Sequence, residues 1–318
     1  MRGSEAPVAT VAICTANRAG RLAETLAAVL SLLDPRACEI VVVDNGSVDD
    51  TPRLLAGLAA AHPRALRAVR EDRPGLSAAR NRAVREARGE LVLFLDDDAL
   101  PAPGWLEAYL AAFHSTPAAA AGGPVEPIFD GALPEWLDAR FLPYLSAWDR
   151  GGEVVPLRYN ELPRGANIGF RRSVFADCGE FLEQLGRRGA SLRSCEEIER
   201  GLRLERGGAP ILYLPAARVR HHVATQRLSE SWMAARFAAQ GFSEAIIDRR
   251  HAGLRGLRSG LGRVERFRRP AADDVLARCL RETARGYRHG ALYALFCVAP
   301  YQPPGGTPLA RFDPPGES

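Results

Sequence analysis

The sequence contains no lysine, so each of its 42 basic residues is an arginine. We attribute this absence to a coding bias toward GC-rich codons and draw no functional conclusion from it. Basic residues exceed acidic ones by only 42 − 38 = 4, an excess too small to indicate nucleic acid as a partner. We therefore expect no binding to nucleic acid.

Cysteine motifs and long apolar runs are also missing. None of the six cysteines stands in a CxxC or other metal-ligand spacing, and the first ten residues hold no apolar stretch typical of a signal peptide. We therefore expect reduced thiols in a cytoplasmic protein. No apolar run approaches the roughly 18 residues that a membrane span needs, and residues 291–300 come closest.

Several enzyme fingerprints are absent as well. The chain has no GxGxxG or GxxxxGK[ST] motif, which removes the usual signatures of dinucleotide-binding and P-loop proteins. It has no GxSxG or HExxH motif either. Its composition, with 47% hydrophobic and 25% charged residues, is nevertheless that of an ordinary globular enzyme.

What the first 125 residues do contain is a regular alternation of expected strands and helices. Apolar runs predict the strands, and apolar residues at helical spacing predict the helices between them. The strands are expected over 8–14, 39–44, 65–70 and 91–95, and the helices over 21–33, from 51 onward and over 77–88. This alternation predicts an α/β fold, with a parallel sheet covered by helices on both faces and ligands bound at the carboxyl ends of its strands.

Acidic residues follow two of these strands. Asp96, Asp97 and Asp98 end the fourth strand. Because alternate residues of an extended chain point the same way, Asp96 and Asp98 can face one Mg²⁺ or Mn²⁺ ion that in turn binds a diphosphate. Asp44 ends the second strand, where it can accept hydrogen bonds from a base or a ribose. The alternatives are a solvated acidic turn for the triplet and an Asx turn for Asp44.

Two further pairs of residues are candidates for chemistry. Glu196 and Glu197 precede a helical stretch, where they either favour the start of a helix or contain a general base with a raised pKa. His221 and His222 close an expected strand. There they serve as metal ligands or as phosphate contacts, or they form a plain surface pair.

Taken in order, seven segments of the chain resemble the family 2 glycosyltransferases, which have the GT-A fold. Each segment alone is a weak signal, so the resemblance depends on their order and spacing, and it covers roughly residues 8–241. The segments are VAICTANR (11–18), IVVVDNGSVDDT (40–51), GLSAARNRAV (75–84), ELVLFLDDDALP (90–101), GANIGFRRSVF (165–175), EEIERGLRLERGG (196–208) and ILYLPAARVRHH (211–222).

The resemblance implies a donor site at the matching positions. Thr15, Asn17 and Arg18 would approach the nucleotide. Asp44 would hold the base, and Arg80 would lie beside the base or the phosphates. The DxD element would supply Asp98 to the metal, Asp96 to the metal and the ribose, and Asp97 to the same nucleotide-sugar site.

The resemblance also implies the rest of the catalytic machinery. His221 would complete the metal site, and the catalytic base would be drawn from Glu196 and Glu197. Glu197 matches the second member of the family's acidic pair, although that member is usually Asp. Cys195 stands before the pair where Gly is more frequent, so the choice between the two glutamates stays open.

We therefore expect an inverting glycosyltransferase that depends on Mn²⁺ or Mg²⁺ and belongs to polysaccharide or glycolipid biosynthesis. It would move a sugar from a nucleotide-diphospho-sugar to a hydroxyl of a glycan or lipid-linked acceptor. One alternative is a sugar-1-phosphate nucleotidyltransferase, although TANRAG (15–20) lacks the dense glycine and basic residues of that class. The other is a non-catalytic relative that binds a sugar nucleotide or glycan, against which the DxD element and the acidic pair argue.

The same resemblance implies a nucleotide-sugar-binding half (1–125) and an acceptor-side and catalytic half (126–245). The composition beyond them predicts a basic helical extension with a flexible tail (246–318). Within the extension, four glycines between Arg249 and Arg269 predict a mobile loop or short helices. This basic segment is either a solvated surface or a site that attracts an anion, namely an anionic membrane at the inner face of the cell membrane or a lipid-linked pyrophosphate acceptor. Its candidate apolar anchor is formed by Tyr287, Leu292, Tyr293, Leu295 and Phe296.

Overall fold

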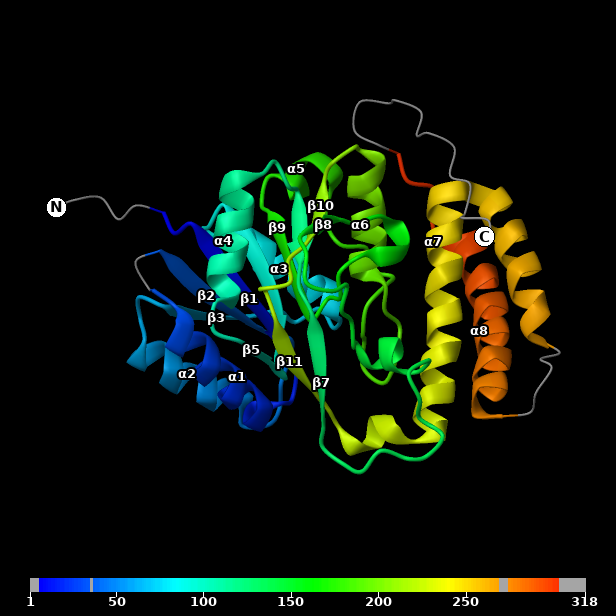
Figure 1. The fold of residues 1–318 in the computed structure, drawn as a ribbon, viewed down its shortest axis with the longest axis horizontal. Helices are drawn as coiled ribbons and strands as arrows, with labels where there is room; N and C mark the ends of the chain where they lie inside the picture. The colour runs from blue at the N-terminus through cyan, green and yellow to red at the C-terminus, as the bar shows by residue number, and fades with distance from the viewer. Residues whose placement is uncertain (1–5, 35–36, 269–273, 303–318) are drawn as a thin grey trace.

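The computed structural model describes residues 6–34, 37–268 and 274–302. The fold is built on an eight-stranded sheet (Figure 1). The order of strands in this sheet is β3-β2-β1-β4-β9-β6-β10-β8. Its strands are β1 (Ala9–Thr15), β2 (Cys38–Asp44), β3 (Leu66–Arg70), β4 (Leu91–Asp96), β6 (Ala120–Gly122), β8 (Val155–Pro156), β9 (Asn167–Arg171) and β10 (Ile211–Tyr213).

The first four strands of the sheet run parallel, as the alternation of apolar runs predicts. β1 pairs in parallel with β2 and with β4, and β2 pairs in parallel with β3. β9 is antiparallel to both of its neighbours, β4 and β6, whereas β10 is parallel to β6. The predicted α/β fold with a mostly parallel sheet is confirmed.

Helices cover both faces of the sheet because alternate strand residues point to opposite sides. In β2, Ile40 and Val42 belong to one apolar core and Val41 and Val43 to the other. The first core is covered by α1 (Ala19–Leu32), α2 (Thr51–Ala61) and α4 (Trp105–Ser115). The second is covered by α3 (Leu76–Glu86), α5 (Val174–Cys178) and α6 (Glu196–Arg206).

A smaller sheet of order β5-β11-β7 carries one of the expected histidines to the acidic triplet. Its strands are β5 (Ala99–Pro101), β7 (Val125–Phe129) and β11 (Val219–Val223). β5 begins directly after Asp98 and pairs antiparallel with β11, so that His221 lies opposite Ala99. The main-chain N–H of His222 donates to the carbonyl oxygen of Asp98 at 2.9 Å. This pairing therefore fixes the position of His221 beside the end of β4.

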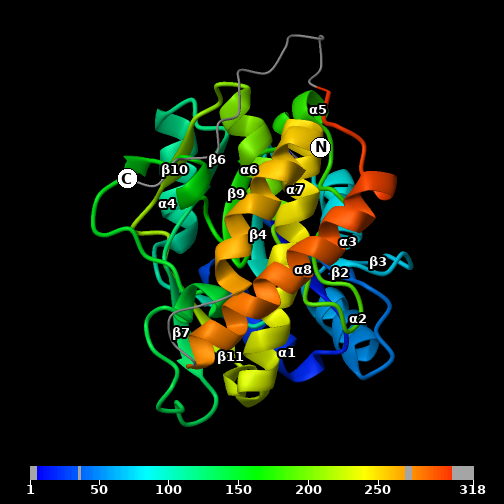
Figure 2. The ribbon, with the colours of Figure 1, turned by 90° about the vertical axis from the view of Figure 1, so that its right-hand side faces the viewer.

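Two long helices, α7 (Glu230–Glu265) and α8 (Val275–Cys297), pack on each other at the side of the molecule (Figure 2). The basic segment expected to be a loop or short helices is helical, with one sharp bend at Gly253, whose φ is 62°. Gly256, Gly260 and Gly262 do not interrupt the helix, and the first two pack closely against Asp248. The boundary expected after residue 245 falls inside α7. Arg269 and most of the tail expected to be flexible from Pro300 onward, namely residues 303–318, lie outside the described residues.

A buried carboxylate ties α6 to α7. Glu199 of α6 is fully buried and accepts from His251 and Arg250 of α7, each at 2.9 Å, and it also pairs with Arg203 at 2.8 Å. Burial acts to raise the pKa of Glu199, but the hydrogen bond from His251 and the charge of Arg203 outweigh it and lower the pKa to about 2. Because an unpaired buried charge is costly, these contacts hold the two helices together.

Among the described residues, no helix has the length and apolarity that crossing a membrane would require.

Candidate active site

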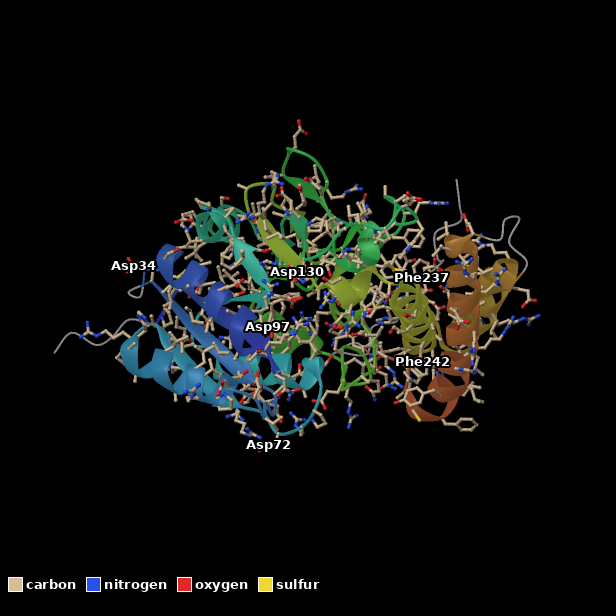
Figure 3. All side chains as sticks on the ribbon, turned by 90° about the horizontal axis from the view of Figure 1, so that it is seen from below. Asp34, Asp72, Asp97, Asp130, Phe237 and Phe242 are labelled. Carbon is tan, nitrogen blue, oxygen red and sulfur yellow. The ribbon has the colours of Figure 1, made fainter. Side chains whose placement is uncertain are left out.

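A cavity of about 1280 Å³ opens at the carboxyl ends of β1 and β4. In Figure 3, Asp97 marks this central region, while Phe237 and Phe242 mark α7 beyond it. With one exception, the predicted site residues line this single cavity, namely Thr15, Asn17, Arg18, Arg80, Asp96, Asp97, Asp98, Glu196, Glu197 and His221. Segments far apart in the sequence are therefore brought to one place.

The exception is Asp44, which is buried but is not part of the cavity wall. Its Oδ1 accepts the main-chain N–H of Ser47, three residues further on, at 2.9 Å. The next residue, Asn45, does line the cavity. The base-holding role of Asp44 stays a prediction.

The first and third aspartates of the triplet gather around His221. Asp96, Asp98 and His221 each offer one ligand atom, and these atoms lie within 4.8 Å of one another. His221 Nε2 is 3.0 Å from Asp98 Oδ1, whereas the buried Nδ1 of His221 has no hydrogen-bond partner among the described residues. Burial would raise the pKa of Asp98, but His221, Arg18 and Arg227 overcome this effect and hold it well below its usual range. The carboxylate of Asp98 is therefore an anion.

Asp97 points to the loop after β1, as the alternation of side chains predicts. Its Oδ2 accepts the hydroxyl of Thr15 at 2.6 Å, and its Oδ1 lies 3.1 Å from Arg18. Burial and the neighbouring charge of Asp98 raise the pKa of Asp97 to about 7. Arg18 also pairs with Asp98, so its guanidinium already neutralises part of the charge of the triplet.

Asn17 connects this loop to the one after β2. Its main-chain N–H donates to Ser47 Oγ at 2.9 Å, and its side-chain oxygen accepts the N–H of Val48 at 2.8 Å. Asn17 has a positive φ of 56°. The other two non-glycine residues with positive φ in the described ranges, Ser146 and Cys195, also line the cavity. Such backbone conformations cost energy and gather at functional sites.

Arg80 joins the aspartates to the acidic pair. It is 2% exposed, and its guanidinium contacts Glu196 Oε1 at 2.5 Å, Asp96 Oδ1 at 3.5 Å and the carbonyl oxygen of Gly165 at 3.0 Å. Burial and the nearby charge of Glu197 raise the pKa of Glu196 to about 7, although Arg80 acts in the opposite direction. The short contact with Arg80 holds the carboxylate of Glu196 in an ion pair.

Glu197 differs from Glu196 in having no ion-pair partner in the described part of the chain. It lines the cavity, and its Oε2 is buried without a hydrogen-bond partner. Cys195, directly before the pair, has a left-handed φ of 73°, which glycine adopts more easily. Burial raises the pKa of the Cys195 thiol to about 12, so it is no nucleophile.

A further part of the cavity wall was not predicted from the sequence. It comprises Arg164, Arg187, Arg227, Trp232, Arg236, Gln240, Glu244 and Asp248. Its members on α7 recur every four residues, and Ser229 caps the helix by accepting from the N–H of Trp232. In the sequence, polar residues recur at this spacing and the apolar Met233, Phe237 and Ile247 stand beside them. This pattern indicates an amphipathic helix with one polar face.

The chain is similar to one protein family and to several individual proteins. Residues 10–179 match the family described as glycosyl transferase family 2. The chain is 29% identical over 245 residues to a glucosyl-dolichyl phosphate glucuronosyltransferase of Haloferax volcanii, covering 75% of this chain and 77% of that protein. It is 28% identical over 230 residues to the succinoglycan biosynthesis protein ExoM of Rhizobium meliloti, covering 71% and 70%.

A solved structure has a similar fold. The mannosyltransferase PcManGT from Pyrobaculum calidifontis, in complex with GDP-Man and Mn²⁺, superimposes with a TM-score of 0.59. The match covers 92% of this chain and 88% of that one at 20% sequence identity.

Proposed function

The chain belongs to glycosyl transferase family 2 and has the GT-A fold, and from this premise we propose that it transfers a sugar from a nucleotide-diphospho-sugar to an acceptor hydroxyl with inversion. The observation that carries the proposal is the meeting of the DxD aspartates, His221 and the acidic pair in one cavity. Residues 1–125 would bind the donor, and 126–245 would supply the acceptor side.

The donor would bind over the acidic triplet together with a divalent cation, Mn²⁺ or Mg²⁺. The residues present fit such an ion, because one ligand atom from each of two carboxylates and an imidazole lie within 4.8 Å of one another. Asp96, Asp98 and His221 would hold it, and when bound it supplies positive charge to the diphosphate. The Mn²⁺ and GDP-Man bound to PcManGT support this assignment.

Arginines of this chain would stabilise the leaving group. Arg18 and Arg227 both lie beside Asp98, and each guanidinium can donate two hydrogen bonds to phosphate oxygens. As the bond between the sugar and the diphosphate breaks, the departing nucleoside diphosphate gains negative charge, which these donors stabilise. The loop of Thr15 and Asn17, with Asp44 and Asn45 behind it, would hold the nucleoside.

Glu197 would be the base that removes the proton of the acceptor hydroxyl. The raised pKa of Glu196 favours Glu196 for this role, but its carboxylate is already paired with Arg80. Glu197 has an oxygen with no partner and faces the same cavity. The acceptor oxygen would attack the sugar carbon from the side opposite the diphosphate as its proton passes to Glu197, which accounts for inversion.

A lipid-linked or glycan acceptor is supported by the relatives, one named for a dolichyl phosphate substrate and one for succinoglycan biosynthesis. The exposed Leu292, Leu295 and Phe296 of α8 and the exposed Arg255 and Arg258 of α7 support peripheral contact with an anionic membrane. Tyr287, expected in the apolar anchor, is instead buried and donates to Asp248.

The membrane contact gives a testable prediction. We expect the protein to co-sediment with anionic vesicles at low salt and to dissociate as salt rises, because each arginine near such a surface contributes about 1 kcal/mol. Replacing Arg255 and Arg258 by Glu should reduce sedimentation, whereas Arg53→Glu on α2 should not. Binding that ignores lipid charge would contradict the proposal.

The donor proposal is tested by a thermal-shift panel of nucleotide sugars with and without Mn²⁺. We expect one donor to raise the melting temperature only when Mn²⁺ is present, since a ligand that binds the folded state stabilises it in proportion to the logarithm of its concentration over Kd. Release of nucleoside diphosphate from that donor would distinguish a transferase from a non-catalytic binder. Consumption of a nucleoside triphosphate with a sugar 1-phosphate would instead identify a nucleotidyltransferase.

A further inference from the structure

One wall of the cavity is formed by a single face of α7. Trp232, Arg236, Gln240, Glu244 and Asp248 follow one another at four-residue intervals, and all of them line the cavity. They form a ladder in which Arg236 donates to Gln240 at 3.1 Å and Gln240 donates to Glu244 at 3.0 Å. A volume of about 1280 Å³ exceeds the roughly 300–1,000 Å³ of a pocket for one small ligand. The cavity therefore has room for a second substrate on this side.

Three arginines on this side lack acidic partners. Arg236 is 9% exposed, and its Nε has no hydrogen-bond partner among the described residues. The buried Nε of Arg164 has none there either. In the described part of the chain, no carboxylate lies within 4.0 Å of the guanidinium groups of Arg164, Arg187 or Arg236. Arg236 is buried, and Arg164 and Arg187 are partly buried. Cations removed from water without a counter-ion are costly, so the site favours an anion.

The three guanidinium groups are close enough to affect one another. Burial, together with the positive charges of Arg236 and Arg227, lowers the pKa of Arg187 to about 10. Burial also lowers the pKa of Arg164, where Arg236 acts in the same direction and Glu197 opposes both. Arg236 is thus the common neighbour of Arg164 and Arg187, and Arg164 lies on the side of Glu197.

We propose that Arg164, Arg187 and Arg236 bind a phosphate group of the acceptor substrate. The proposal rests on the function proposed above and assigns this group to the acceptor. Arg164 lies near Glu197 and Arg236 belongs to α7, whereas Arg18 and Arg227 lie beside Asp98. Three planar guanidinium groups match the several oxygens of a phosphate, to which arginine donates paired hydrogen bonds. A phosphate held there would place the attached acceptor beside Glu197.

The test is calorimetric binding of phosphate esters to the protein saturated with its nucleoside diphosphate and Mn²⁺. Citronellyl phosphate represents a lipid-linked phosphate, glucose 1-phosphate a free sugar phosphate, and octyl glucoside a neutral control. We expect one phosphate ester to bind without displacing the nucleotide, and the tighter of the two identifies the source. Arg236→Gln should weaken that binding by roughly 10- to 100-fold, as loss of a charged hydrogen bond does.

Matched variants separate this proposal from the function on which it rests. Arg187→Gln, at a less buried position, should show the same loss if Arg236→Gln fails to fold, and Arg53→Gln on the exposed surface of α2 should show none. Phosphate esters that displace the nucleotide, or that bind the parent and the variants equally, would overturn the acceptor subsite while leaving the donor proposal intact. Failure of nucleoside diphosphate and Mn²⁺ to bind at all would instead refute the proposed function.

Discussion

Glu197→Gln is expected to lower the rate of sugar transfer by roughly 10²- to 10⁴-fold, the range for loss of a general base. The amide has the same shape as the carboxylate but cannot take a proton from the acceptor hydroxyl. Donor binding should be retained, because Glu197 makes no ion pair with the arginines beside Asp98 in the described part of the chain. The measurement is release of nucleoside diphosphate from the donor identified by thermal shift, with donor affinity determined in parallel.

Two other glutamates of α6 serve as comparisons. Glu196→Gln should lower the rate less than Glu197→Gln, through loss of the ion pair with Arg80. Glu205→Gln lies in the last turn of the same helix, outside the cavity wall, and should leave the rate unchanged. If Glu197→Gln turned over as fast as the parent, the base would have to be Glu196 or no residue of this pair.

Asp98→Asn is expected to remove the Mn²⁺-dependent part of donor binding, a loss of roughly 10²-fold at saturating metal. Asparagine is preferable to alanine here, because Asp98 is buried against His221, Arg18 and Arg227, and alanine would remove the contacts of all three with residue 98. The amide keeps the shape of the side chain but lacks the negative charge that a divalent cation needs. Calorimetry of nucleoside diphosphate with and without Mn²⁺ measures the effect.

Asp130→Asn provides the matched control for Asp98→Asn. Asp130 also pairs with a histidine, His222 at 2.9 Å, and with Arg21, yet it lies outside the cavity wall. The Asp130→Asn variant should therefore bind nucleotide and metal as the parent protein does. Unchanged Mn²⁺ dependence in Asp98→Asn would show that the metal, if one binds, is held elsewhere.

Local patterns of the sequence were sufficient to predict the sheet and the position of the acidic triplet. The apolar run Leu91 to Leu95 specifies a strand buried on both faces, and the end of a parallel strand is where ligands bind. The convergence of Asp96, Asp98 and His221 depends instead on the pairing of β5 with β11, which joins residues more than 100 positions apart. That contact was anticipated through resemblance to a family and not through periodicity.

The wall formed by α7 could not be anticipated in the same way. Its residues between Trp232 and Asp248 lie beyond the segments that resemble the family. In the second half of the same helix, glycines at 253, 256, 260 and 262 weaken any helix prediction because glycine is a poor helix former. Only Gly253 takes a conformation outside the helical region, whereas Gly256 and Gly260 are needed for close approach to Asp248 and Tyr287. Propensity alone does not separate these two uses of glycine.

The contacts of Glu199 have a consequence for protein engineering. The helix that begins with the acidic pair is anchored by His251 and Arg250, which belong to the same α7 that lines the cavity. Exchanging residues 230–302 for those of a relative, in order to change acceptor preference, would also remove two of the partners of the buried carboxylate of Glu199 and leave Arg203. A working chimaera would therefore have to import a matching histidine and arginine or replace Glu199 at the same time.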